Sequence, residues 1–207
     1  DCTGASNTGT FQRSTDCTIS VTVNVNDRTY YGGGVVVTNT LEIVGTVEDM
    51  NNLIVITAPS KQRHFYINGV NDKLVLRYLK LEGGDVSSDS GGSICIYTSG
   101  GTLLLYSSII ANNKAYNVGG GIYAHGDSSN SEHRQVIING STITGNQASN
   151  DASGAGGGGL YIYNSNCVLV RTEISRNTAG GGGGLYLSND GSGTMTVDIR
   201  ETTFTAN

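Results

Sequence analysis

The chain has 207 residues, of which 31 are glycine and one is proline, and its formal net charge at pH 7 is −5. Charged residues make up 14% of the sequence, against about 25% in an average soluble protein. The single proline argues against a collagen-like chain, and the aliphatic and tyrosine content suffices for a packed core. Phosphate binding needs clustered lysine and arginine, which the sequence lacks, so nucleic acid is not an expected partner. No apolar run reaches the roughly 18 residues of a membrane span.

Residues 1–17 have no hydrophobic periodicity and are predicted to form an N-terminal cap loop. Cys2 and Cys17 bracket this polar segment, and we predict that they form a disulfide, which favours an oxidising, extracellular setting. Two free thiols in a loop are the alternative. The chain begins at Asp1 and not at methionine, so we interpret it as a segment of a larger, secreted protein. Asn139 is a candidate for N-glycosylation, because it begins the sequon Asn-Gly-Ser.

From Thr18 onward, short runs rich in valine, isoleucine, threonine and tyrosine alternate with glycine, asparagine and aspartate, which is typical of strands and turns. The strands expected before Lys73 are Ile19–Val25, Tyr30-Tyr31, Val35–Val37, Leu41–Val44, Leu53–Ile56 and Phe65–Ile67. No window has apolar residues at helical spacing, so we predict almost no helix.

From Lys73 the sequence repeats with a period of about 30 residues. One apolar residue recurs at the same phase of each period: Leu81, Ile110, Ile143, Ile174 and Phe204. Each is preceded by an apolar pair: Leu74/Leu76, Leu103/Leu105, Val136/Ile138, Cys167/Leu169 and Val197/Ile199. Three short strands in a period of this length are typical of a solenoid whose coils stack on one another. The sequence therefore predicts an all-β fold, a single-stranded parallel β-helix over residues 18–207, right-handed by the rule for parallel crossovers.

The repeat contains a Ser/Thr-x-Ile/Phe-x-x-Asn phrase followed by Gly-Gly-Gly-Ile/Leu-Tyr, as in Ser141–Asn146 with Gly156–Tyr161. This pattern resembles the repeats of polymorphic outer-membrane proteins, which carry FxxN and GGA[I/L] motifs. The resemblance covers about residues 74–207 and implies a right-handed parallel β-helix of the kind found in surface adhesins. Similar glycine-rich segments occur in large secreted filament proteins such as flagellar-hair proteins. The chain departs from the motif in preferring Ile to Phe and Gly-Gly-Gly-Leu-Tyr to Gly-Gly-Ala-Ile, and a shared fold does not by itself carry function.

Two polar columns of the repeat are interpreted as structural ladders at the corners of the coils. The asparagine ladder contains Asn113, Asn146, Asn177 and Asn207, and the hydroxyl ladder contains Ser108, Ser141, Thr172 and Thr202. We expect the asparagines to adopt the left-handed backbone of a sharp corner and to bond between coils, and the hydroxyls to satisfy turn amides. In the first repeat the asparagine position holds Gly84, which suits the corner but cannot extend the ladder.

The glycine runs 119–121, 156–159 and 181–184 precede strands and are expected to allow tight bends and close approach of backbones. A phosphate-binding loop is the other use of such runs. Neither a Lys-Ser/Thr pair nor a helix start follows them, so the phosphate-loop pattern is not met.

After each glycine run, strand alternation turns aromatic side chains outward. Coils stack about 4.8 Å apart, so these residues are predicted to form an aromatic strip along one face: Tyr97, Tyr123, His125, Tyr161, Tyr163 and Tyr186. Such rings can stack simply to stabilise a sheet, but exposed aromatic rows also mark contacts with glycans or other chains. We predict that the strip binds other protein chains, further repeats of the same protein, or glycans. Cys95 is expected to point outward, free or paired to another chain, and Cys167 to be a buried thiol not bonded to Cys95.

Many parallel β-helices act on acidic polysaccharides, so a polysaccharide lyase or glycoside hydrolase is the alternative function. These enzymes need a basic residue beside acidic calcium ligands, or paired carboxylates. The densest charged group contains Arg171, Glu173, Asp198, Arg200 and Glu201. Its signs alternate, as in surface ion pairs. Turn chemistry accounts for Asp85 and Asp89, and the three histidines His64, His125 and His133 lack metal-ligand spacing. No catalytic residue, metal or cofactor is expected.

Ice binding is a third possibility, because flat β-solenoids with Thr-x-Thr rows bind ice. Two pairs have this spacing, Thr142/Thr144 and Thr203/Thr205, but Ile109/Ala111 and Glu173/Ser175 interrupt the row. The sequence therefore favours a non-catalytic, extracellular, structural or adhesive β-helix segment of a cell-surface or filament protein. Because it ends in mid-repeat at Asn207, we expect either a longer parent chain or assembly of copies through open strand edges.

Overall fold

The computed structural model of the protein describes residues 10–11, 33–37, 39–46, 48–97, 100–126, 134–149, 156–191 and 194–207. The predicted Cys2–Cys17 disulfide, the expected strands Ile19–Val25 and Tyr30-Tyr31, and His133 lie outside these residues. In the described part every sheet is built from parallel neighbours and no helix occurs. The strands wind into a right-handed parallel β-solenoid of about 5 turns, so the predicted architecture is confirmed.

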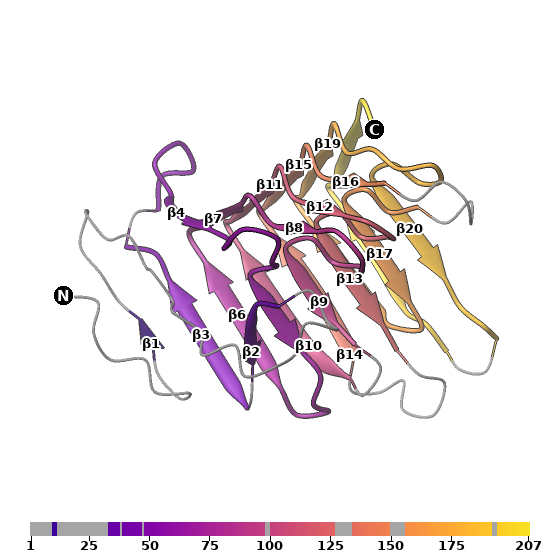
Figure 1. Ribbon diagram of the computed structural model, residues 1–207, viewed down its shortest axis with the longest axis horizontal. Helices are drawn as coiled ribbons and strands as arrows, with labels where there is room; N and C mark the ends of the chain where they lie inside the picture. The colour runs from indigo at the N-terminus through magenta and orange to yellow at the C-terminus, as the bar shows by residue number, and fades with distance from the viewer. Residues whose placement is uncertain are drawn as a thin grey trace.

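The walls of the solenoid are three long sheets and one short one, whose strands succeed one another along the axis (Figure 1). Sheet 1 contains β1 (Thr10–Phe11), β3 (Thr40–Val44), β6 (Lys73–Arg77), β10 (Gly101–Tyr106), β14 (Arg134–Asn139), β18 (Asn166–Val170) and β21 (Val197–Arg200). Sheet 2 contains β4 (Ile54–Thr57), β7 (Leu79–Glu82), β11 (Ile109–Ala111), β15 (Thr142–Thr144), β19 (Glu173–Ser175) and β22 (Thr203–Thr205). Sheet 3 contains β2 (Val35–Val37), β5 (Phe65–Ile67), β9 (Ile94–Ile96), β13 (Ile122–His125), β17 (Leu160–Tyr163) and β20 (Leu185–Ser188).

Two features of the walls differ from the prediction of three strands per coil preceded by a cap loop. A short sheet forms between sheets 2 and 3 from β8 (Asp85–Val86), β12 (Lys114–Ala115) and β16 (Gln147–Ala148). These strands have only two residues, too few for a readable alternation of apolar and polar side chains. At the N-terminal end, β1 pairs in parallel with β3, so part of the predicted cap loop extends sheet 1.

The interior is filled by the apolar columns that the repeat predicts. Leu81, Ile110, Ile143 and Ile174 occupy one register across sheet 2 and are fully buried. The same column continues backward to Ile56 through the pairing of β4 with β7, one coil before the repeat becomes recognisable in the sequence. Burial of each such side chain contributes roughly 1.5–3 kcal/mol. Cys167 is buried in the corresponding column of sheet 1, as predicted.

The asparagine ladder forms as predicted, on successive coils. The Oδ1 atoms of Asn146, Asn177 and Asn207 each accept hydrogen bonds from the backbone and side-chain amides of the asparagine one coil before, at 3.0 Å for both bonds from Asn113 to Asn146. Each Nδ2 atom donates to a carbonyl oxygen of the preceding coil, as from Asn146 to Ile110 at 3.0 Å. The hydroxyl ladder also forms, since the backbone amide of Ser108 donates to Ser141 Oγ at 3.2 Å. Because these groups are buried, each unmade bond would cost free energy.

The corner geometry corrects one expectation about the asparagines. The left-handed residue is the one before each ladder position: Gly83, Asn112, Gly145, Arg176 and Ala206, with φ between 53° and 77°. The ladder asparagines are not among the residues with positive φ. The chain therefore reverses one residue earlier, and the next residue is left to point its amide into the corner. The same offset precedes the hydroxyl ladder, where Ser107, Gly140, Arg171 and Glu201 are left-handed.

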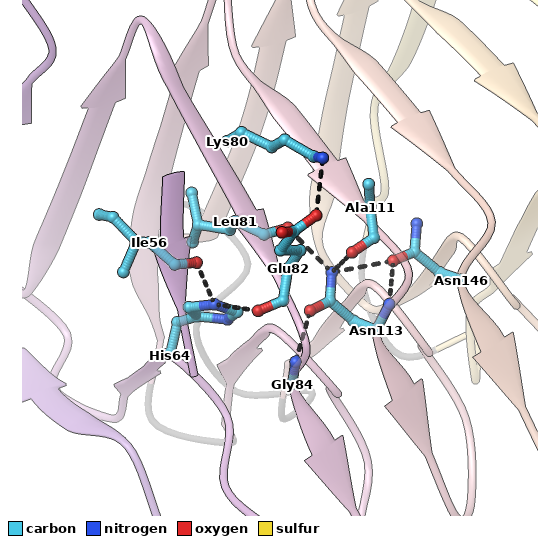
Figure 2. A network of polar contacts seen from close by, with 9 residues as sticks. All are labelled: Ile56, His64, Lys80, Leu81, Glu82, Gly84, Ala111, Asn113 and Asn146. Carbon is cyan, nitrogen blue, oxygen red and sulfur yellow. Dashed lines mark hydrogen bonds and ion pairs between the residues drawn. The ribbon is translucent and has the colours of Figure 1, made fainter. Parts of the chain in front are cut away.

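His64 replaces the asparagine that the ladder lacks at Gly84 (Figure 2). Its Nε2 atom lies 3.0 Å from the carbonyl oxygen of Ile56 and 3.1 Å from that of Glu82. One coil later, Asn113 Nδ2 donates to the equivalent carbonyls of Leu81 and Ala111. Both neighbours of Nε2 are acceptors, so this nitrogen carries the proton, and Nδ1 accepts from Ser93 Oγ at 3.0 Å. The histidine thus makes the two bonds of the missing amide.

The position of His64 also explains the last glycine of each glycine run. Its register position is occupied by Ser93, Gly121, Gly159 and Gly184 in the following coils. A Cβ atom on Gly159 would lie 2.5 Å from the carbonyl oxygen of Gly184 and 3.1 Å from Cγ of Asn177. Wherever the next coil carries a ladder asparagine, this position therefore holds a small residue, which is Ser93 before Asn113 and glycine before Asn146, Asn177 and Asn207. Where that coil carries Gly84, the space accommodates an imidazole ring.

Candidate functional site

The residues of the aromatic strip lie on the outer face of sheet 3, in two adjacent columns. Parallel pairing aligns Tyr123 with Tyr161 and Tyr161 with Tyr186. In the second column, pairing aligns His125 with Tyr163, and Tyr97 lies at the corresponding position one coil before. The first column also contains Tyr66, which the sequence prediction missed, because Tyr66 pairs with Cys95 and Cys95 with Tyr123. The alternation of the expected strand Phe65–Ile67 was a signal that could have found it.

The rings of the strip stack on one another along the solenoid axis. Tyr161 and Tyr186 have centroids 5.0 Å apart and planes inclined by 3°, and Tyr123 and Tyr161 are 5.5 Å apart at 21°. His125 and Tyr163 stack at 4.7 Å and 11°. Parallel stacking follows from the in-register pairing of the strands, which places like side chains over one another.

The first column of the strip is covered at its N-terminal end and open toward its C-terminal end, whereas Tyr97 and His125 in the second column are half-buried. Tyr123 is only 9% exposed, and Tyr66 and Val118 pack with it around Cys95. The segments that precede sheet 3 in neighbouring coils are hydrogen-bonded here, with the Gly91 amide donating to the Val118 carbonyl at 3.0 Å. Tyr161, Tyr163 and Tyr186 are half-buried. In the first column the surface available to a partner is therefore shorter than the sequence suggests, and Tyr123 belongs to the packing beneath it.

Cys95 corrects a second expectation. Its side chain points outward from sheet 3, yet it is 1% exposed beneath the aromatic side chains. A disulfide to another chain is not accessible from this position. Burial raises the pKa of the Cys95 thiol to about 12, so the group is neutral. Cys95 and Cys167 are both free thiols, which confirms that they are not bonded to each other.

Burial keeps the phenol groups of Tyr161 and Tyr123 neutral at ordinary pH. Burial, followed by the neighbouring Tyr186 and Tyr163, raises the pKa of the Tyr161 phenol. Burial is also the main cause of the raised pKa of Tyr123, with Cys95 the next contributor. A partner would therefore meet apolar ring surface and neutral hydroxyl groups rather than charge.

A buried ion pair beside the strip was not predicted. The Arg63 side chain is 0% exposed, and its Nη2 atom lies 2.7 Å from Asp89 Oδ2. The guanidinium carbon lies 5.5 Å from the centre of the Tyr66 ring. Arg63 Nε and Nη1 have no hydrogen-bond partner in the described part of the chain. Asp89 also accepts from the Ser90 amide, as turn chemistry predicts, but its second oxygen anchors this loop to the preceding coil.

The charged group near the C-terminus contains one ion pair of the expected kind. Arg200 and Asp198 form an exposed ion pair at 2.9 Å. Arg171 instead donates from Nη2 to the Asn139 side-chain oxygen at 3.1 Å, so the glycosylation candidate is held by a side-chain contact at the end of β14. Asp85 begins β8 and does not lie in a loop. In the described residues, no three His, Cys, Asp or Glu side chains are grouped to hold a metal ion.

The threonine pairs considered for ice binding lie on the outer face of sheet 2. Pairing aligns Thr142 with Glu173, and Glu173 with Thr203, so a charged residue separates the two pairs. The interruption expected from the sequence is thus present in the sheet.

Comparison with known protein families identifies one repeat unit. Residues 107–125 match the Chlamydia polymorphic membrane protein repeat. The matched residues comprise a left-handed corner, β11, the ladder residue Asn113, β12, the glycine run and β13. Comparisons with curated proteins and with solved structures gave no significant match. Within the described residues, no helix has the length and apolar character to cross a membrane.

Proposed function

We propose that the protein is a non-catalytic, adhesive β-helix segment of an extracellular, cell-surface protein, and that it contacts other protein chains through the open end of the aromatic strip. The match of residues 107–125 to the polymorphic membrane protein repeat supports a surface location. The contact residues are Tyr161, Tyr163 and Tyr186, which are half-buried on the outer face of sheet 3.

The stacking of the rings is the observation that carries this proposal. Tyrosine provides a large, rigid contact area at a low cost in conformational entropy. A sugar binds best on an open aromatic face, whereas Tyr161 turns its two faces toward Tyr123 and Tyr186. The row therefore offers mainly ring edges and neutral hydroxyls, which favours a protein partner over a glycan.

The ion pairs support a non-catalytic role. Several carboxylates of the described residues are engaged with basic side chains. Asp89 pairs with Arg63, Glu82 with Lys80 and Asp198 with Arg200. In each pair the basic side chain occupies a carboxylate oxygen that a substrate or a metal ion would otherwise contact.

The test is adhesion of protein-coated beads to one another and to intact cells. We expect the triple variant Tyr161→Ser, Tyr163→Ser, Tyr186→Ser to lose adhesion. Matched controls are Tyr106→Ser, on the outer face of sheet 1, and Tyr116→Ser, which is 50% exposed. Both should adhere like the parent protein, and circular dichroism would verify that each variant keeps its strands.

Two pretreatments of the cells separate the classes of partner. Protease digestion should abolish adhesion, and periodate oxidation of glycans should leave it unchanged; the reverse pattern would assign the strip to glycans. Absence of any adhesion by the parent protein would overturn the proposal. Turnover of pectin, alginate or chondroitin, with or without calcium, would overturn its non-catalytic part.

A further inference from the structure

We propose that Tyr161 and Tyr186 form an oxidative cross-linking site, in which a one-electron oxidant joins the two rings as dityrosine and links neighbouring coils covalently. The two residues are paired in register between β17 and β20. Their centroids are 5.0 Å apart with planes at 3°, the shortest and most parallel tyrosine pair in the described part of the chain. Both side chains are half-buried, so each has a surface that an oxidant can reach.

The chemistry balances with hydrogen peroxide and a peroxidase as the oxidant system. Each phenol O–H bond gives up one proton and one electron, which leaves two phenoxyl radicals. A carbon–carbon bond forms between ring positions next to the oxygens. The hydrogen on each of these carbons then moves to the phenol oxygen and restores both aromatic rings. The two tyrosines together lose two hydrogen atoms, and one peroxide molecule is reduced to two waters.

The neighbouring tyrosines are less suited to this reaction, for separate reasons. Tyr123 also stacks on Tyr161, but at 5.5 Å and 21°, and it is covered by the packing around Cys95. Tyr123 is 9% exposed, so an oxidant reaches its phenol less readily than those of Tyr161 and Tyr186. Tyr163 stacks on His125, and its register partner on the next strand is Ser188, which has no ring.

The consequence of the link is mechanical. The segment between Tyr161 and Tyr186 includes β18 and β19, so the bond encloses nearly a full coil. Closing such a loop covalently reduces the freedom of the unfolded chain. The coils at the open end of the strip could then no longer separate. The inference does not depend on the adhesive role, because it rests only on ring geometry and exposure.

The experiment treats the full chain, at low concentration, with peroxidase and hydrogen peroxide. Cleavage after lysine and arginine places the relevant tyrosines on different peptides: Tyr123 on 115–134, Tyr161 and Tyr163 on 135–171, and Tyr186 on 177–200. We expect dityrosine fluorescence in the monomer band and a linked 135–171/177–200 peptide whose mass is the sum less two hydrogens. Fragmentation assigns the bond to Tyr161 rather than Tyr163. The linked protein should also melt at a higher temperature.

Phenylalanine variants keep the stacked ring but remove the phenol. Tyr161→Phe and Tyr186→Phe should each lose the linked peptide, whereas Tyr163→Phe and Tyr116→Phe should retain it. Three outcomes would overturn the proposal: dityrosine confined to dimers and lost on dilution, a link that survives Tyr161→Phe, or equal yield from the chain unfolded in urea.

Discussion

The coil at residues 63–97 and the coils from residue 107 onward solve the same structural problem in different ways. We call the first the irregular coil and the second the regular coils. In the regular coils, a buried carbonyl receives the amide of a ladder asparagine, and glycine leaves room for that amide, as with Gly159 beneath Asn177. In the irregular coil the two positions exchange roles. Glycine occupies the ladder position at Gly84, and His64, at the position that glycine holds in the regular coils, donates the hydrogen bond to the buried carbonyls.

The difference shows that the fold requires a hydrogen bond to the buried corner carbonyl but does not require a particular residue to donate it. A buried carbonyl must be paired, and any side chain that delivers an N–H to it satisfies the requirement. The exchange has a consequence that asparagine avoids, because imidazole can take up a proton and amide cannot. The two kinds of coil should therefore respond differently to substitution, acid and salt.

The largest effect should come from breaking the ladder within the regular coils. Asn146→Ala removes two acceptor bonds from Asn113 and two donor bonds, to Ile110 and Asn177, all in buried surroundings. Each unsatisfied buried group costs roughly 1–3 kcal/mol, and we expect a loss of about 4 kcal/mol in the free energy of unfolding in urea. Asn207→Ala, at the last ladder position, is the matched control and should cost about half as much, because Asn207 makes three such bonds and not four and is itself exposed. Equal losses would contradict a cooperative ladder.

Acid should weaken the irregular coil before the regular ones. Burial lowers the pKa of His64 from 6.5 to about 4, so the folded state binds fewer protons than the unfolded state between these values. Stability contributed by neutral His64 is complete above pH 6.5 and is lost as the pH falls toward 4. The loss amounts to about 3 kcal/mol.

The measurement is the free energy of unfolding of the parent protein and of His64→Gln across this pH range. Glutamine cannot be protonated, so the variant should lack this component of the pH dependence. Carboxylates contribute equally to both proteins, and the difference between the two curves isolates His64. Parallel curves would show that protonation of His64 does not oppose folding.

A smaller change in stability should come from the buried ion pair between Arg63 and Asp89 in the irregular coil. Removing only the carboxylate should cost more than removing the buried guanidinium. Asp89→Ala leaves the Arg63 charge buried without its partner. Because the Asp89 side chain is 25% exposed, we expect a loss of about 2 kcal/mol in the free energy of unfolding, below the roughly 3–5 kcal/mol of a fully buried pair. Arg63→Met, which removes the buried charge and keeps an apolar stem over Tyr66, should cost less. If Arg63→Met proved the more damaging of the two, the pair would be a net source of stability.

The smallest effect belongs to the ion pair of the regular coils. Arg200 is 64% exposed, and its contact with Asp198 is open to solvent. Such pairs contribute between about 0 and 1 kcal/mol and are screened by salt. We expect Arg200→Ala to change the free energy of unfolding by less than about 0.5 kcal/mol. An effect comparable to that of Asp89→Ala would contradict the distinction between the two pairs.

Much of the architecture could be predicted from the sequence because a parallel solenoid repeats its environment at a fixed interval. The columns headed by Leu81, the asparagine ladder and the alignment of Tyr123, Tyr161 and Tyr186 all followed from residue phase alone. The prediction failed where a contact joins residues that occupy different positions of the repeat in two neighbouring coils. His64 and Gly84 illustrate this. The sequence of neither column shows that His64 makes the hydrogen bonds that an asparagine at position 84 would make.

The candidate surface divides in the same way. Strand alternation placed Tyr123 and Cys95 on the outer face, but it could not tell that neighbouring segments cover them. Exposure depends on what packs above a side chain, and that is set by turns whose lengths differ from coil to coil. Arg63 and Asp89 likewise meet only because one loop folds back over the preceding coil.

The sequence alone determined which residues stack on which, because the period of the repeat and the alternation of each strand leave one register that buries the apolar columns. Only the tertiary structure decided which stacked residues are open to solvent, where the left-handed residue of each corner lies, and that an imidazole replaces a missing amide. The physical reason is that stacking is a property of one column, whereas burial and hydrogen-bond satisfaction depend on all the columns that meet at a corner.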